Sequence, residues 1–263
     1  MGQKKKIKTK VISQKKIADK IYDMWMEADL AETAKAGQFL CIYPHNESTL
    51  LPRPISICEA DRENGRLRIV YRVAGKGTEE LSGYHADRSI EILGNLGNGF
   101  PLEAADGKRV LLMGGGIGIP PMLQLAKELR QEGKAAEVTV IARYRDSQLF
   151  LKEDMEKYAR VYVATEDGSV GTKGNVMDVM EEHGLSADVI MACGPMPMLR
   201  AIKRYAGEHG TEAYISLEER MACGVGACLG CVCRTVEKDA HSHVNNARIC
   251  TDGPVFPAKD VDI

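Results

Sequence analysis

The sequence of 263 residues lacks the features of membrane-spanning and nucleic-acid-binding proteins. No apolar run approaches the roughly eighteen residues that a transmembrane helix needs. The formal charge is −2, so the chain has no excess of positive charge with which to bind a nucleic acid. A secretory signal peptide is not recognisable either, which leads us to expect a cytoplasmic location, where thiols stay reduced.

Disulfide bonds are also not expected, although the chain contains eight cysteines. Disulfide frameworks are typical of small secreted domains, whereas a chain of this length can bury a hydrophobic core without them. Cys223, Cys228, Cys231 and Cys250 follow the spacing C-x4-C-x2-C…C, which is typical of the ligands of a plant-type [2Fe-2S] cluster. Cys233 is offset by two residues from Cys231, and we interpret it as a bystander.

The residues around these cysteines also favour a cluster. Gly224, Gly226 and Gly230 allow the tight turns that aim backbone N–H groups at cluster sulfurs. A structural zinc site is the main alternative, but such sites usually combine two Cys-x2-Cys hooks, and the sequence contains one. A Rieske site with His241 and His243 is not favoured, because both lie in a polar stretch typical of a solvated loop.

The chain before the cysteines divides into two patterns. Short apolar segments separated by turn residues predict a small antiparallel β-barrel, with strands at 8–17, 20–28, 38–43, 55–60, 66–73 and 88–93. Within 66–73, apolar Leu67, Ile69, Tyr71 and Val73 alternate with Arg66, Arg68 and Arg72, as expected for a half-buried strand. The barrel is predicted to end near Pro101.

After Pro101, strands alternate with helices, which predicts a doubly wound parallel sheet. Strands are expected at 110–113, 137–142, 160–164, 188–192 and 213–217. Helices are expected at 122–132 and from near Asp146, Gly174 and Met196. We therefore divide the chain into a β-barrel domain at 1–101, an α/β domain at 102–215 and a cluster subdomain at 216–263.

Two segments suit phosphate binding. Gly114, Gly115, Gly116, Ile117 and Gly118 join an expected strand to a helix, whose N-terminus attracts a pyrophosphate. A simple tight turn is the alternative, because the spacing is not G-x-G-x-x-G. In the barrel, Arg53-Pro54-Ile55-Ser56 brings a cation and a hydroxyl together, and Gly77-Thr78 adds flexible backbone. An edge strand at Pro54 and a capped helix at Thr78 explain these residues equally well.

The order of these parts resembles the ferredoxin reductase superfamily and, within it, the electron-transfer subunits of class 1B dihydroorotate dehydrogenases. The resemblance covers residues 38–256. Its most specific tracts are the ten residues from Glu219 to Cys228 and the seven from Cys250 to Phe256.

The resemblance implies three cofactor sites. FAD would bind in the barrel, with Arg53 facing its pyrophosphate and Ser56 near flavin N5. The other FAD residues implied are Pro54, Ile55, Val70, Tyr71, Arg72, Gly77 and Thr78. Many superfamily members have an aromatic residue where this chain has Ile55, so the flavin ring is expected to meet an aliphatic side chain. NAD would bind at Gly114 to Gly118, with its nicotinamide bordered by Cys193, Gly194, Pro195 and Met196. Cys223, Cys228, Cys231 and Cys250 would bind the cluster.

The resemblance also implies a function in pyrimidine biosynthesis. Electrons would pass from an FMN-containing catalytic subunit through [2Fe-2S] and FAD to NAD, with two copies of each subunit. This chain is too short for a (β/α)8 barrel and has no second flavin motif, so dihydroorotate would be oxidised on the partner.

Two alternative functions and one alternative nucleotide remain. The first alternative is a flavin iron–sulfur subunit of the ferredoxin:NADP oxidoreductase or sulfide dehydrogenase type, whose cluster tract commonly begins with Asp in place of Cys223. The second is a zinc-bearing, nucleotide-binding regulator without enzymatic activity. Arg143 and Arg145 suit an NADP 2′-phosphate and Asp146 suits a ribose hydroxyl, while the resemblance favours NAD.

Overall fold

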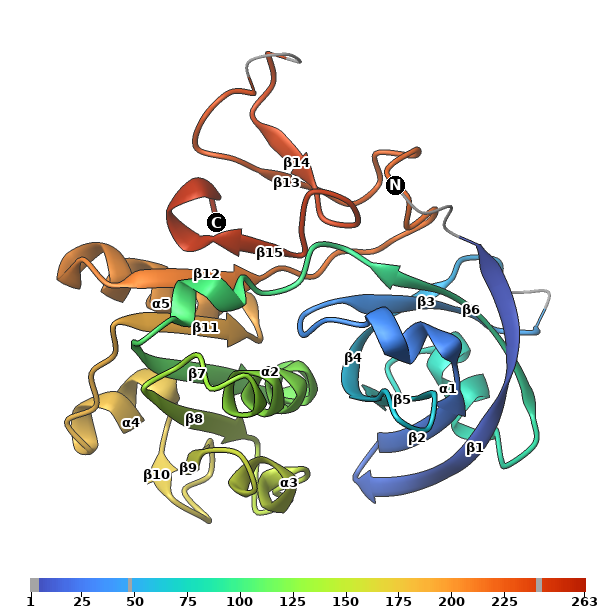
Figure 1. The fold of residues 1–263 in the computed structure, drawn as a ribbon, viewed down its shortest axis with the longest axis horizontal. Helices are drawn as coiled ribbons and strands as arrows, with labels where there is room; N and C mark the ends of the chain where they lie inside the picture. The colour runs from blue at the N-terminus through green and yellow to red at the C-terminus, as the bar shows by residue number, and fades with distance from the viewer. Residues whose placement is uncertain (1–4, 47–48, 240–242) are drawn as a thin grey trace.

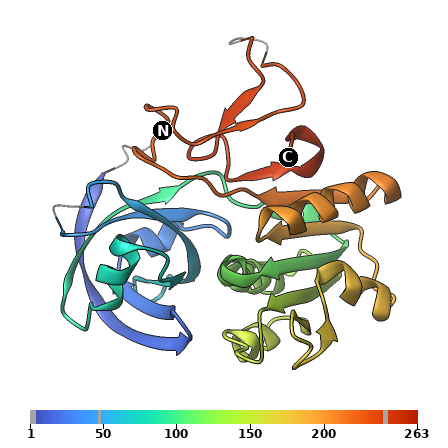
Figure 2. The ribbon, with the colours of Figure 1, turned by 180° about the vertical axis from the view of Figure 1, so that it is seen from behind.

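The computed structural model describes residues 5–46, 49–239 and 243–263, so His241 of the Rieske alternative lies outside the described residues. A β-barrel and an α/β body lie side by side (Figure 1). The C-terminal segment crosses one end of both bodies, as the view from behind also shows (Figure 2). This three-part arrangement confirms the predicted fold class.

The barrel is closed and antiparallel, with strand order β1-β2-β5-β4-β3-β6. Its strands are β1 (Lys6–Ala18), β2 (Ile21–Glu27), β3 (Phe39–Tyr43), β4 (Arg53–Asp61), β5 (Arg66–Arg72) and β6 (Ser89–Leu96). Apolar side chains at alternate positions fill the interior, for example Leu67 and Ile69 of β5 with Met24 of β2. The short helix α1 (Lys76–Ser82) follows β5 and carries Gly77 and Thr78.

The second body is a seven-stranded sheet in the order β10-β9-β8-β7-β11-β12-β15. Its strands are β7 (Arg109–Gly115), β8 (Glu137–Tyr144), β9 (Arg160–Thr165), β10 (Thr172–Lys173), β11 (Val189–Cys193), β12 (Glu212–Ser216) and β15 (Val255–Pro257). All neighbouring pairs are parallel except β12 and β15. The edge strand β15 comes from the C-terminal segment, which is thereby tied to the sheet.

Helices cover both faces of this sheet (Figure 1). They are α2 (Ile119–Gln131), α3 (Lys152–Glu156), α4 (Val176–Glu182) and α5 (Met196–His209). Val110 and Leu112 of β7 pack with α2 and α3, whereas Leu111 and Met113 of the same strand pack on the side of α4 and α5. A strand buried on both faces explains the continuous apolar run in the sequence.

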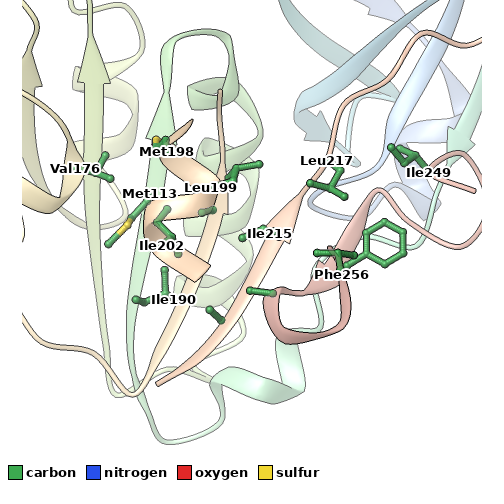
Figure 3. Packing of buried hydrophobic residues seen from close by; sticks show 14 of the residues in the cluster. Met113, Val176, Ile190, Met198, Leu199, Ile202, Ile215, Leu217, Ile249 and Phe256 are labelled. Carbon is green, nitrogen blue, oxygen red and sulfur yellow. The ribbon is translucent and has the colours of Figure 1, made fainter. Parts of the chain in front are cut away.

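The core on the α4 and α5 side extends into the C-terminal segment. Figure 3 shows Met113, Ile190 and Ile202 packed between the sheet and α5, and Leu217, Ile249 and Phe256 continuing toward the C-terminal segment. That segment also contains a small antiparallel hairpin of β13 (Val232–Arg234) and β14 (Asn246–Arg248). The 3-10 helices are η1 (Asp29–Thr33), η2 (Leu102–Ala105), η3 (Gly116–Gly118) and η4 (Ala258–Asp260).

Local signals set most helix starts. Prolines 120 and 121 occupy the first turn of α2, where a missing N–H costs nothing. Asn175 caps α4 by accepting a hydrogen bond from Met177 N at 2.8 Å. The helix predicted from near Asp146 is wrong. The Asp146 carboxylate accepts a hydrogen bond from Gln148 N at 2.9 Å, a local turn that competes with helix, and α3 begins only at Lys152.

Buried polar groups join the barrel to the α/β body. Arg68 of β5 bonds to Asp23 of the barrel at 2.9 Å through two nitrogens, and to Asp154 of α3 at 2.9 Å. Glu128 of α2 accepts from Ala36 N at 3.1 Å and from Arg62 at 2.7 Å. Because such bonds are directional, they fix the relative position of the two bodies. In the part of the chain that the structure describes, no helix is both long and apolar enough to cross a membrane.

Candidate functional site

A cavity with a volume of about 520 Å³ lies where the three parts of the chain meet. Its walls come from the ends of β4 and β5, from Ile117 of the glycine turn, and from the segment that follows β12. The carboxyl ends of β7, β11 and β12 point to this side of the sheet, which is where parallel sheets bind ligands.

The predicted FAD residues gather in this cavity. Its lining includes Arg53, Pro54, Ile55, Ser56, Val70, Tyr71, Arg72 and Thr78. The Ile55 side chain is buried there, as expected for an aliphatic surface in place of an aromatic ring. The Tyr71 hydroxyl donates to Gln14 Oε1 at 2.7 Å, which fixes the orientation of its ring.

Gly77 lies beneath Arg53 and is the one predicted FAD residue outside the cavity lining. A Cβ at Gly77 would lie 2.3 Å from Arg53 Nε, so only glycine allows the guanidinium to cross the start of α1. Arg53 also donates to Leu51 O at 2.7 Å. The helix is capped at Gly75 and not at Thr78; Thr78, its third residue, accepts from Gly75 N at 3.2 Å through Oγ1, as in a capping box.

Sequence patterns did not predict one wall of the cavity. That wall consists of Ser216, Leu217, Glu218, Glu219, Arg220 and Met221, with Phe39, Ala74 and Pro254 nearby. The available signal was topological, because 216–221 directly follows the last parallel strand, whose carboxyl end points to the ligand edge. Burial raises the pKa of the Glu218 carboxyl, and the positive charge of Arg72 opposes that rise.

The two predicted NAD segments lie next to each other. Gly114 of β7 pairs with Cys193 of β11, so the glycine turn and the segment 193–196 share one edge of the sheet. A Cβ at Gly118 would lie 2.2 Å from Cys193 O, which is too close for any other residue. Prolines 120 and 121 have no N–H and Ile119 N donates to Gly116 O, so a phosphate here would meet the backbone of the glycine turn and the positive end of the α2 dipole.

The Cys193 side chain is a packing group in this structure. It is 1% exposed and does not line the cavity. Burial raises the pKa of its thiol, and Glu218 adds to that rise, so the neutral thiol is strongly favoured. Gly194, Pro195 and Met196 form the turn that leads into α5.

The four predicted cluster ligands are arranged as two pairs. The thiols of Cys223 and Cys228 are close enough to affect each other's ionisation, and so are those of Cys231 and Cys250. A [2Fe-2S] cluster has two iron ions with two protein ligands each, so a two-plus-two grouping suits it. Within residues 5–46, 49–239 and 243–263, no three Cys, His, Asp or Glu side chains are grouped so as to hold one metal ion.

Backbone N–H groups point at these sulfurs, as the glycine content predicts. Cys223 Sγ accepts from Val225 N and from Cys228 N, both at 3.4 Å. Gly226 N donates to Cys250 Sγ at 3.2 Å, and Gly230 N to Cys228 Sγ at 3.4 Å. Burial by itself raises the pKa of Cys223, but its backbone hydrogen bonds outweigh burial and lower that pKa to about 6. The environment of Cys223 therefore favours a thiolate, the form that binds iron, whereas burial and the neighbouring Cys231 raise the pKa of Cys250 to about 12.

The remaining cysteines are free thiols. Cys233 lies in β13 opposite Ala247, and burial raises its pKa. Cys41 of β3 is fully buried and lies directly beneath the cluster segment. A Cβ added at Gly224 would lie only 2.9 Å from Cys41 Sγ, so the two residues are in close contact. Gly224 thus serves close packing against the barrel, whereas Gly226 and Gly230 supply N–H donors.

Two families match separate parts of the chain. Residues 218–262 match the iron–sulfur cluster binding domain of dihydroorotate dehydrogenase B, and residues 112–204 match the oxidoreductase NAD-binding domain. The first match contains all four predicted cluster ligands, and the second contains the glycine turn and Cys193 to Met196.

Relatives and solved structures are similar over nearly the whole chain. A protein of Listeria welshimeri named dihydroorotate dehydrogenase B (NAD(+)), electron transfer subunit, is 43% identical over 97% of this chain and 98% of its own length. A structure of NADH-dependent reduced ferredoxin-NADP oxidoreductase superposes with a TM-score of 0.86 at 29% identity, covering 100% of this chain and 91% of that chain. The ferredoxin NADP+ reductase of Neisseria gonorrhoeae, with bound FAD and NADP, shares the fold (TM-score 0.67, 18% identity, 83% of this chain, 95% of that chain).

The family match at 218–262, the near full-length identity and the ferredoxin-reductase fold agree with one another. The chain therefore belongs to the family of the electron transfer subunits of dihydroorotate dehydrogenase B, a family of NAD-linked oxidoreductase subunits.

Proposed function

We propose that this chain binds FAD, NAD and a [2Fe-2S] cluster and passes electrons from a dihydroorotate-oxidising partner to NAD in pyrimidine biosynthesis. The observation that carries the proposal is the cavity shared by all three parts of the chain. A flavin held there would touch the barrel, the glycine turn and the segment that leads into the cysteine array.

The FAD site fits the cofactor in its shape and chemistry. Arg53, which Gly77 leaves room for, would bind the pyrophosphate together with Thr78. Ser56 would place its hydroxyl near N5 of the ring, and Ile55 and Tyr71 would exclude water from it. When bound, FAD supplies hydride exchange with nicotinamides and single-electron exchange with iron–sulfur clusters.

The NAD site would lie at the carboxyl edge of β7 and β11. Gly114 to Gly118 would take the pyrophosphate, and Cys193, Gly194, Pro195 and Met196 would border the nicotinamide. Because Ile117 lines the cavity, this arrangement would hold the nicotinamide against the flavin. Hydride transfer requires that contact, and the contribution of the protein is to position the two rings.

The cluster site would consist of Cys223, Cys228, Cys231 and Cys250. Its fit rests on the two thiol pairs and on the four N–H groups directed at their sulfurs. Such hydrogen bonds stabilise the negative charge on cluster sulfurs and tune the reduction potential. All eight cysteines are free, which supports a reducing compartment, and we propose the cytoplasm.

The partner would be an FMN-containing catalytic subunit, and by family resemblance we expect two copies of each chain. Val225 and Leu229, which flank the cluster ligands, are 44% and 61% exposed. Apolar side chains of this kind around an exposed redox site support docking of another protein. Electrons would then cross at the cluster without a long path through solvent.

Anaerobic purification of the full chain tests the proposal directly. We expect bound FAD, iron and acid-labile sulfide, and oxidation of NADH with an artificial dye. NAD reduction by dihydroorotate should require both this chain and the FMN subunit. A colourless protein that contains zinc but no iron, sulfide or flavin would support the regulator alternative and reject the redox function. A protein that oxidises NADPH in preference to NADH would point to the ferredoxin:NADP oxidoreductase alternative.

A further inference from the structure

The sequence left the choice between NAD and NADP open, and the structure contains a charged pair at the relevant place. Arg143 lies near the end of β8 and pairs directly with Gly115 of β7. The pyrophosphate is proposed to bind at this glycine turn and the nicotinamide on the β11 side of β7. The adenosine must then extend over the other neighbours of β7, which are β8 and β9.

The Arg143 side chain is already engaged by a carboxylate from the next strand. Its Nη2 lies 2.5 Å from Glu166 Oε1, directly after the end of β9. The arginine side chain is 24% exposed and the Glu166 side chain is 49% exposed, so the carboxylate is the outer member of the pair. Among the described residues, Arg143 Nε is buried without a hydrogen-bond partner. The guanidinium is therefore only partly satisfied by protein groups, and its exposed portion is the part that a ligand could reach.

Glu166 is held in place by its backbone. Its N–H donates to Tyr144 O at 3.2 Å, which extends the pairing of β8 and β9 by one residue. Thr165, fully buried, donates from Oγ1 to Val170 O at 2.8 Å and fixes the loop that follows. The carboxylate is therefore positioned at the sheet edge and is not free to move away with a flexible loop.

Asp146 and Arg145, the other groups that the sequence suggested for binding the adenosine ribose or its 2′-phosphate, differ from this pair. The Asp146 carboxylate accepts hydrogen bonds from Gln148 N at 2.9 Å and from Gln148 Nε2 at 3.2 Å, so it already serves the local turn. Arg145 is exposed, and an exposed cation is hydrated and contributes little to binding. Arg143 and Glu166 are thus the charged groups next to the glycine turn with a fixed geometry.

We propose that Glu166, by neutralising Arg143, makes the adenosine site selective for NAD over NADP. This inference rests on the proposed function, because it requires that the glycine turn bind the dinucleotide. Glu166 would be a specificity-determining residue outside every pattern that the sequence offered, since it lies more than twenty residues beyond the end of β8.

Two physical effects support this role. The 2′-phosphate of NADP carries close to two negative charges, so it must either sit beside the Glu166 carboxylate or displace it from Arg143, and both are unfavourable. The ribose of NAD has a 2′-hydroxyl in that position, which can donate a hydrogen bond to the same carboxylate. Glu166→Gln keeps the size and the acceptor oxygen of the side chain but removes its charge and releases Arg143.

Calorimetric titration of the FAD-loaded full chain with 2′,5′-ADP and 5′-AMP tests the inference without turnover. We expect Glu166→Gln to tighten binding of 2′,5′-ADP by about tenfold, equivalent to about 1.4 kcal/mol, and to leave 5′-AMP within about threefold. Steady-state oxidation with a dye should show a matching rise in kcat/KM for NADPH relative to NADH. Arg143→Gln added to Glu166→Gln should abolish the gain.

Asp188→Asn is the matched control. Asp188 pairs with Arg109 at 3.0 Å at the opposite, amino edge of the same sheet, so its loss should not alter the ratio of the two probes. An equal effect of Glu166→Gln on both probes, or a gain that survives removal of Arg143, would overturn the inference alone. A wild-type protein that oxidises NADH but binds 2′,5′-ADP more tightly than 5′-AMP would also overturn it. A wild-type protein that oxidises neither nucleotide would reject the proposed function, and the inference with it.

Discussion

The three parts of the chain meet at two junctions, and these junctions are built from different interactions. The barrel and the α/β body are joined by buried charges: Arg68 is 8% exposed, Asp23 is 1% exposed and Glu128 is 3% exposed. Asp23 holds Arg68 from within the barrel, Arg68 bonds across the junction to Asp154, and Glu128 bonds across it to Arg62 and to Ala36 N. Protein groups alone satisfy this junction, so it is complete before any cofactor binds.

The C-terminal segment is joined to the rest mainly by apolar contacts. Ile249, Cys250 and Phe256 belong to the core that extends from the sheet, and Asn98 N donates to Gly253 O at 2.8 Å. In contrast, the cluster loop itself has exposed side chains, and its N–H groups bond to thiols. Such a site is completed by the metal cluster, since metal binding and folding are coupled. The junction of barrel and α/β body is therefore satisfied by protein groups, whereas we expect the loop at 222–231 to be ordered fully only when its cofactor is bound.

Cys250→Ser should disrupt the C-terminal segment around the cluster and leave the junction between the barrel and the α/β body intact. We expect iron and acid-labile sulfide to fall to near zero and the loop at 222–231 to become sensitive to protease, because the loop loses the cluster that orders it. FAD content and NADH–dye activity should persist, while activity with the partner is lost. Iron analysis, visible spectra and limited proteolysis measure these effects. Cys233→Ser is the control and should keep the cluster, and loss of iron in that variant would show that the ligand assignment is wrong.

Arg68→Met should weaken the junction between the barrel and the α/β body without affecting the cluster. The substitution leaves the Asp23 carboxylate buried with its main partner removed, with only Lys15 at 3.8 Å remaining. Breaking a buried ion pair in this way costs about 3–5 kcal/mol of unfolding free energy. Urea denaturation measures that loss. Arg66→Met changes an exposed arginine two residues earlier on β5 and should have little effect. Similar losses in the two variants would mean that the buried network does not hold the junction.

Gly118→Ala tests how tightly the glycine turn is packed against Cys193 at the carboxyl edge of β7 and β11. The new Cβ would lie 2.2 Å from Cys193 O and 2.4 Å from Cys193 C, and these backbone atoms cannot move without separating β7 from β11. Overpacking of this kind costs about 1–3 kcal/mol, and we expect NADH affinity to fall by about tenfold or more. Gly207→Ala in α5, where nothing lies within 4 Å of the new Cβ, should stabilise the protein slightly. Normal NADH binding by Gly118→Ala would contradict the close packing of the two segments.

The sequence predicted best where one local pattern carries the structure. Short apolar segments separated by turn residues predicted the barrel, and strand–helix alternation predicted the parallel sheet. Cysteine spacing predicted an iron–sulfur segment within the region that matches the iron–sulfur domain at 218–262. Arg68 illustrates the limit. Alternation places Arg68 on the polar face of β5, yet the side chain is buried because it pairs with Asp23 and Asp154. These partners lie 45 and 86 residues away in the chain. No local window contains those partners.

The cavity wall at 216–221 was missed for a related reason. Those residues have no periodicity and no phosphate-binding pattern, and they reach the flavin cavity only because β12 ends at that edge of the sheet. Similarly, the pair of Arg143 and Glu166 arises from the parallel register of β8 and β9 and not from sequence spacing. Sequence patterns predicted the segments that gather at the cavity and at the glycine turn, whereas the groups that surround them depend on tertiary contacts.

The smallest expected effect concerns the exposed apolar residues of the cluster loop. Leu229→Ser removes a side chain that is 61% exposed, so its effect on unfolding free energy should be within about 0.5 kcal/mol. Binding of the FMN subunit should nevertheless weaken several-fold, measured by surface plasmon resonance, because this side chain would be buried in the complex. Leu50→Ser removes an exposed leucine from the β3–β4 loop of the barrel and should leave partner binding unchanged. If both variants weakened binding equally, the partner would contact the barrel as well, and the cluster loop would not be the sole place where it docks.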